Sequence, residues 1–129
     1  MRWARETEDD ILIADHQFGL GFILVWAGKP GQAVAMLQEA AGAAEALGNV
    51  PLQSRCLTYL GIAYRMVGDE AGVQESIEKL APVVAATNDS LYLGVAQALH
   101  AWLQWRAGAM EAAENHGRAA LRQWEAAIT

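Results

Sequence analysis

Three evenly spaced glycines constrain this chain more than any other feature. Gly28, Gly68 and Gly108 are separated by 40 residues each, and each directly follows a stretch rich in apolar residues. Glycine is typical of the left-handed conformation that ends a helix, because it lacks a Cβ. The spacing therefore predicts an internal repeat in which each glycine forms the turn of a helical hairpin.

A second set of turn signals lies between these glycines. The segments 48–51 (Gly-Asn-Val-Pro) and 87–90 (Thr-Asn-Asp-Ser) recur with nearly the same period and carry the residue types of loops. We expect them to be longer loops that join one helix pair to the next. The windows between all these signals are of helical length, so the sequence predicts six helices, at about 8–27, 30–47, 53–67, 70–86, 91–107 and 109–126.

Apolar residues recur at three- and four-residue steps inside these windows. Leu60 and Tyr64 follow this step in one window, and Ile77 and Leu80 follow it in the next. Such spacing places side chains on one face of a helix, so we expect these four to be buried. No window alternates with a period of two, which favours an all-α fold. Pro82 lies inside one window, where it should kink or shorten the helix.

Composition and charge narrow the possible functions. A chain of 129 residues that is 53% hydrophobic is expected to fold as one domain over residues 1–129. The formal charge of −6 argues against direct binding of nucleic acid and against an anionic membrane surface. Segment 11–27 is largely apolar, but Asp15, His16 and Gln17 interrupt it. It therefore favours a buried helix over a membrane span.

Residues capable of chemistry are few and scattered. Cys56 is the only cysteine and lies in a predicted helix without a catalytic signature, so we expect a buried core residue. His16, His100 and His116 lie in different predicted helices and lack the spacing of metal ligands. We expect no metal, no cofactor and no catalytic residue, and a small all-α enzyme remains a remote alternative. The lone cysteine and the absence of a secretory signal predict a cytoplasmic location.

The middle unit contains apolar and small residues at fixed offsets, namely Leu57-x2-Leu60-Gly61-x2-Tyr64, then Gly68-Asp69, then Val73-x3-Ile77. This motif resembles the tetratricopeptide pattern W-x2-L-G-x2-Y and A-x3-F, with conservative replacements. The outer units follow the pattern less closely, with Gln17, Leu20-Gly21, Leu24, Ala33-x3-Leu37 and Ala40 in the first, and Gln97, His100-Ala101, Gln104 and Ala113-x3-Gly117 in the third.

The resemblance implies a short α-solenoid of three helix–turn–helix repeats, at about 8–48, 52–88 and 91–127. The period of 40 exceeds the family's usual length of about 34 residues. It is similar to the repeats of large bacterial regulators, namely maltose-regulator-type ATPase transcription factors and class III nucleotide cyclases. The implied function is a non-catalytic protein–protein interaction module within a larger cytoplasmic signalling or transcription-regulatory protein.

In tetratricopeptide arrays the first helix of each pair lines a concave groove. That geometry maps a peptide-binding groove onto Phe18, Phe22, Val25, Trp26, Arg55, Thr58, Ile62, Arg65, Met66, Ala98, Trp102, Trp105 and Arg106. Aromatic and basic residues dominate the set, so the resemblance predicts an acidic or amphipathic peptide ligand. The alternative is that the aromatic residues fill space between neighbouring helices, with arginine stems lying over them.

The first predicted helix is apolar on more than one face, with Ile11, Leu12, Ile13, Phe18, Leu20, Phe22, Ile23 and Val25. Neither end of the chain has the sequence of a capping helix with a polar outer face. We therefore expect the N-terminal edge to form a twofold homodimer or to pack on further repeats. A self-associating structural domain without a peptide ligand is the alternative function. A break near 15–17 that folds the first helix back on itself is the competing possibility.

Overall fold

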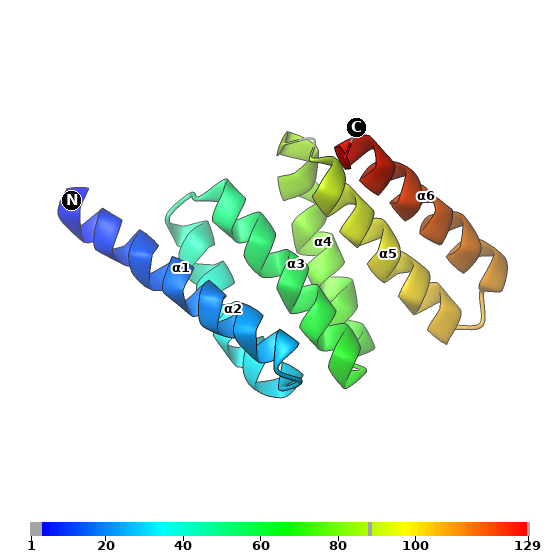
Figure 1. Cartoon of the computed structure of the whole chain (residues 1–129), viewed down its shortest axis with the longest axis horizontal. Coiled ribbons are helices and arrows are strands. Elements are labelled where there is room, and N and C mark those ends of the chain that lie inside the picture. The colour runs from blue at the N-terminus through cyan, green and yellow to red at the C-terminus, as the bar shows by residue number, and fades with distance from the viewer. Residues whose placement is uncertain (1–3, 88, 129) are drawn as a thin grey trace.

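The computed structural model describes residues 4–87 and 89–128, with side chains from residue 8 onward, and these residues form six α-helices and no strand (Figure 1). The helices are α1 (Ala4–Trp26), α2 (Pro30–Ala46), α3 (Val50–Val67), α4 (Glu70–Thr87), α5 (Ser90–Arg106) and α6 (Met110–Ile128). The predicted all-α class and the six expected helices are confirmed.

Helix α1 is longer than expected and continuous. It begins at Ala4 instead of near residue 8 and runs to Trp26 without interruption. The suggested break near 15–17 is therefore wrong, because the polar residues there occupy a helix that continues on both sides. None of the described helices is long and apolar enough to cross a membrane.

Glycines in the left-handed conformation end the helices as predicted. Gly28, Gly68 and Gly108 have φ values of +74°, +78° and +81° in the turns that follow α1, α3 and α5. Gly48 has a φ of +66° in the turn after α2. Glycine accommodates this conformation without the steric cost that a Cβ brings, so these positions fix where each helix ends.

The expected longer loops between helix pairs are absent from the described residues. Only residues 47–49 separate α2 from α3, and the Asn49 side chain accepts a hydrogen bond of 3.2 Å from the Leu52 N–H. Pro51 lies in the first turn of α3, where its missing N–H needs no partner. Asp89 caps α5 by accepting 2.9 Å from the Leu91 N–H. The residues that suggest loops are thus helix-start signals.

The predicted core residues are buried. Leu60, Tyr64, Ile77 and Leu80 are 6%, 8%, 4% and 0% exposed, and they belong to two apolar clusters that join α1 through α5. Pro82 does not shorten α4, since the helix continues to Thr87.

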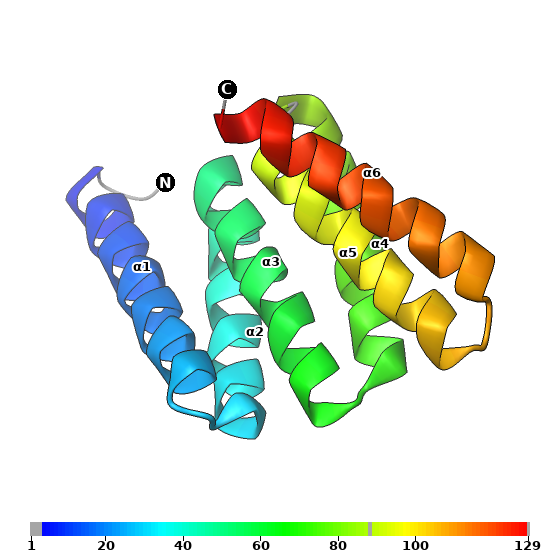
Figure 2. The same ribbon diagram turned by 45° about the vertical axis from the view of Figure 1, so that its right-hand side comes forward.

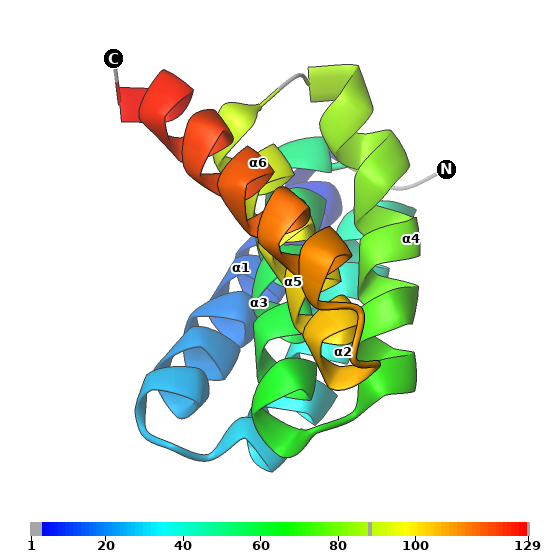
Figure 3. The same ribbon diagram turned by 90° about the vertical axis from the view of Figure 1, so that its right-hand side faces the viewer.

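The helices follow one another across the molecule in chain order, with α1 at one edge and α6 at the other (Figures 1 and 2). Each helix contacts its neighbours in the chain, and α3 also contacts α1 and α5. Over the described residues, no contact joins α2 to α4 or α4 to α6. The end-on view of Figure 3 shows α2 and α4 on the opposite side from α1. Helices α1, α3 and α5 thus share one surface.

The two edges differ in chemistry. Helix α6 exposes six charged or polar side chains, namely Glu111, Glu114, Asn115, Arg118, Arg122 and Glu125, together with the apolar Met110, Leu121 and Ile128. The C-terminal edge thus carries charged and apolar side chains side by side, and the expectation that neither end has a polar outer face stays a prediction. The N-terminal edge instead exposes apolar side chains of α1, namely Leu12, Ile13, Leu20, Ile23 and Trp26.

Candidate functional site

Two adjoining hollows lie on the surface shared by α1, α3 and α5, and together they are called the α1–α3 groove. The first has a volume of about 310 Å³ and is lined by Phe18, Phe22, Arg55, Thr58, Tyr59, Ile62, Leu91, Tyr92 and Val95. The second has a volume of about 450 Å³ and is lined by Val25, Trp26, Gly28, Tyr59, Ile62, Arg65 and Met66. Tyr59 and Ile62 line both hollows, so the groove continues along α3.

Aromatic rings form one wall of the α1–α3 groove. Phe18, Phe22 and Trp26 follow at four-residue intervals, which places them in a row along α1. The Phe22 and Tyr59 ring centroids are 5.0 Å apart with an interplanar angle of 71°, an edge-to-face contact that joins α1 to α3. Phe18 contacts Tyr59 similarly, at 5.8 Å and 63°. The wall is therefore held in place without a ligand, while Trp26 remains 72% exposed.

The three arginines of the predicted groove have different surroundings. The Arg55 guanidinium lies 5.3 Å from the Phe18 ring centroid and 3.6 Å from Asp15 Oδ1. Arg106 Nε lies 3.0 Å from Glu70 Oε1 of α4. Arg65 is exposed and has no ion-pair partner among the residues that the structure describes. Arg65 is thus the one of the three that presents an uncompensated positive charge.

Most of the predicted site residues lie together. The α1–α3 groove contains Phe18, Phe22, Trp26, Arg55, Thr58, Ile62, Arg65 and Met66. Of these, Thr58 is 3% exposed and contributes to the floor, as does the buried Val25.

The predicted residues of α5 line neither hollow of the α1–α3 groove, although Ala98 lines a smaller hollow that adjoins it. Ala98 lines a smaller hollow of about 190 Å³, together with Ile62, Arg65 and Trp124. Trp102 packs partly buried against the core cluster, with the Arg106 guanidinium 5.3 Å from its ring centroid. Trp105 is 55% exposed and, like Trp102 and Arg106, lines none of these hollows. Arg106, the last residue of α5, pairs with Glu70 of α4 and so lies away from the groove.

Sequence reasoning also missed several groove residues. Tyr59, Leu91, Tyr92 and Val95 line the first hollow. The signal for Tyr59 is its spacing, since it lies four residues after Arg55 and three before Ile62 on one face of α3.

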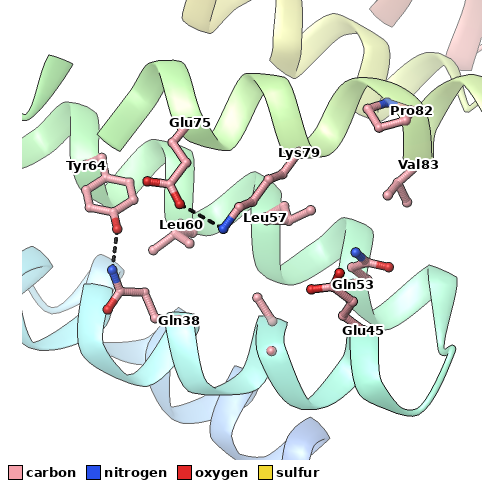
Figure 4. A pocket seen from close by; sticks show the side chains of 12 residues that line it. Gln38, Glu45, Gln53, Leu57, Leu60, Tyr64, Glu75, Lys79, Pro82 and Val83 are labelled. Carbon is pink, nitrogen blue, oxygen red and sulfur yellow. Dashed lines mark hydrogen bonds and ion pairs between the residues drawn. The ribbon is translucent and has the colours of Figure 1, made fainter. Parts of the chain in front are cut away.

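A further hollow, of about 510 Å³, lies on the other side of the molecule, between α2 and α4 over α3 (Figure 4). Its lining is Gln38, Ala41, Gly42, Glu45, Gln53, Leu57, Leu60, Tyr64, Glu75, Lys79, Pro82 and Val83. The Gln38 amide donates to the Tyr64 hydroxyl, and Lys79 Nζ lies 2.8 Å from Glu75 Oε1. The hydrogen bond to Glu75 raises the pKa of Lys79. These polar groups of the α2–α4 hollow therefore already have partners.

Cys56 and two of the histidines have surroundings that the structure defines. Cys56 is fully buried, and burial raises the pKa of its thiol to about 12, so the nucleophilic thiolate is scarce at neutral pH. His100 and His116 stack with ring centroids 5.2 Å apart, although the sequence suggests scattered histidines. In the part of the chain that the structure describes, no group of three or more His, Cys, Asp or Glu side chains is placed to hold a metal ion.

Comparisons with protein-family models, with curated proteins and with solved structures found no match.

Proposed function

We propose that the chain is a tetratricopeptide-like solenoid of three helix–turn–helix repeats that acts as a non-catalytic protein-binding module. Close helix contacts at small residues support this proposal. A Cβ built on Gly61 would lie 2.7 Å from Leu99 Cδ1, and one on Gly72 would lie 2.4 Å from the Tyr64 ring. Small residues at such crossings let paired helices approach closely, as the repeat pattern requires.

The binding surface in this proposal is the α1–α3 groove. The observation that carries it is an ordered aromatic wall beside Arg65, whose charge has no ion-pair partner among the described residues. Aromatic rings offer a large apolar contact area, and arginine pairs strongly with carboxylates. The ligand is therefore an amphipathic protein segment that places apolar side chains against Phe22 and Tyr59 and a carboxylate near Arg65.

The resemblance to the repeats of bacterial regulators suggests the setting. In this proposal the module works in the cytoplasm within a signalling or transcription-regulatory protein, and recognises another protein segment. The charge of −6 disfavours nucleic acid as the ligand.

The test uses peptides selected from a random library for binding to the full chain. Each peptide is also made in a version with its acidic residues changed to lysine. Titration calorimetry then measures the affinity of both versions for the wild-type chain and for Arg65→Glu. The proposal expects Arg65→Glu to weaken the original peptide by about tenfold or more and the lysine peptide to regain part of that loss. Arg122→Glu, at an exposed arginine of α6, is the charge-matched control and should leave the affinity unchanged.

A second measurement reports on the aromatic wall. Phe22→Ala should weaken the same peptides while the helical content, measured by circular dichroism, stays unchanged. If selected peptides bind Arg65→Glu and Phe22→Ala as tightly as the wild-type chain, the groove is not the binding surface.

A further inference from the structure

The exposed apolar residues of α1 form a continuous stripe along its outer face. Leu12, Leu20 and Ile23 are 65%, 40% and 60% exposed, and Ile13 beside them is 58% exposed. Spacing of three, four and eight residues aligns such side chains along one side of a helix. This set, together with His16 and Gly19 between its members, is called the outer stripe of α1. Soluble proteins seldom leave a contiguous apolar patch of this kind uncovered.

The same positions in α3 form a helix-packing seam. Leu52, Cys56, Leu60 and Ala63 follow Leu12, His16, Leu20 and Ile23 by 40 residues each. These four α3 residues are at most 6% exposed, and they share buried clusters with Ala40, Ala44, Ala33 and Leu37 of α2. The outer stripe of α1 therefore has the chemistry of a surface that another helix covers.

The other edge of this chain does not suit that role. The exposed face of α6 carries four charged side chains, Glu114, Arg118, Arg122 and Glu125, around the exposed Leu121. A head-to-tail contact between copies would bury these charged groups against Leu12 and Ile23, at a large desolvation cost. An isologous contact, in which the outer stripe meets itself, avoids this cost, covers the apolar residues of both copies and closes the assembly.

We propose that the chain forms a twofold dimer in which the outer stripes of α1 from two copies pair in antiparallel orientation. Antiparallel pairing about a point between residues 17 and 18 places Leu12 opposite Ile23 of the second copy. It also places His16 opposite Gly19 of the second copy.

Gly19 supports this register. A Cβ built on Gly19 meets no atom within 4 Å, so no close contact inside the chain requires glycine there. Glycine inside a helix is destabilising relative to alanine. In the proposed dimer the missing side chain gives room for the His16 ring of the second copy.

Charges favour the antiparallel orientation. The exposed Glu8 and Asp9 lie near the start of α1, and the exposed Lys29 follows its end. Antiparallel pairing brings the acidic start of one α1 beside Lys29 of the other copy, whereas parallel pairing would bring the acidic residues of both copies together. Like charges held close repel, so the parallel arrangement is disfavoured.

The mass in solution tests the dimer. Sedimentation equilibrium of the wild-type chain should give twice the chain mass at micromolar concentration, and Ile23→Glu should give a folded single chain. Leu121→Glu, at a residue of α6 that is 57% exposed, is the matched control and should remain a dimer. A wild-type chain that stays monomeric at high micromolar concentration overturns the proposal and leaves the outer stripe for a helix of another protein.

Cross-linking tests the orientation without relying on Ile23→Glu folding. Mixing Leu12→Cys with Ile23→Cys should give a covalent mixed dimer under mild oxidation, while Leu12→Cys alone should not cross-link. Efficient cross-linking of Leu12→Cys to itself overturns the antiparallel register. A mixture of Leu12→Cys and Ile23→Cys that does not cross-link overturns it as well. The buried Cys56 should not interfere.

Discussion

The imidazole rings of His100 in α5 and His116 in α6 are stacked, with centroids 5.2 Å apart and planes inclined by 21°. His116 Nδ1 also lies 2.6 Å from Gln104 Oε1. Burial, and to a lesser extent the charge of His116, lowers the pKa of His100. A positive charge on the half-buried His100 ring is therefore unfavourable, so we expect its protonation to weaken the contact between α5 and α6.

Stability should therefore fall in mild acid. The pKa of His100 is lower in the folded chain, so the unfolded chain binds more protons as the pH falls. The free energy of unfolding that the neutral His100 ring contributes is complete above the unfolded pKa of about 6.5. It is lost as the pH falls through the lower pKa of the folded chain. We expect the urea midpoint to be lower near pH 5 than near pH 7.5. His100→Gln should reduce this difference, because it removes the ring whose pKa is lowered. An unchanged difference in His100→Gln would assign the effect to other groups.

Two glycines of the last helix pair should respond oppositely to alanine. A Cβ on Gly94 would lie 2.3 Å from Nε1 of Trp124, whose indole N–H donates 3.3 Å to the Leu91 carbonyl. Gly94→Ala must displace this ring and should cost about 1–3 kcal/mol of unfolding free energy. Gly117→Ala meets open space and should stabilise α6 by about 0.5–1 kcal/mol. Urea denaturation of both variants decides, and equal effects would contradict the Trp124 contact.

Leu60 should be essential to the core. It is 6% exposed within the cluster that joins α1 to α5. Leu60→Ala should cost about 2–5 kcal/mol in reversible denaturation, through lost burial and a residual cavity. Leu121→Ala, at an exposed position of α6, should change stability by less than about 0.5 kcal/mol. A loss below about 1 kcal/mol for Leu60→Ala would reject its assignment to the core.

Cys56 should be unreactive in the native chain. Its side chain is fully buried and the pKa of its thiol is about 12. A chromogenic disulfide reagent at neutral pH should modify it much more slowly than free cysteine, and urea should restore the normal rate, because the thiolate is the reacting form. Native labelling at the rate of free cysteine would show that the helices around it open readily.

The positions of the helices follow closely from local chemistry. The turn at Gly108 was predictable because a left-handed residue ends a helix whatever it packs against. The same local chemistry also misled, since Asn49 and Pro51 suggest a loop but begin α3. Both roles use polar and φ-restricted residues, so composition alone does not separate a loop from a helix start.

The site was less predictable because it depends on how helices rotate against each other. Arg106 occupies the position expected for a groove residue, but its partner Glu70 belongs to α4 and turns it away. The His100 and His116 contact had a signal that sequence reasoning did not use. Both residues lie eight positions from Gly108, and positions equidistant from the turn meet in an antiparallel helix pair.

The contact pattern also determines the order in which the chain can lose structure. Among the described residues the backbone of α6 lies close only to that of α5, and α6 contributes nothing to the two apolar clusters that join α1 through α5. Peeling α6 away would leave both clusters intact, so fraying from the C-terminal end needs no global unfolding. Amide protons of α6 should then exchange with solvent before those of the other helices. A pulling force on the C-terminus would release α6 in a separate step before the rest of the chain unfolds.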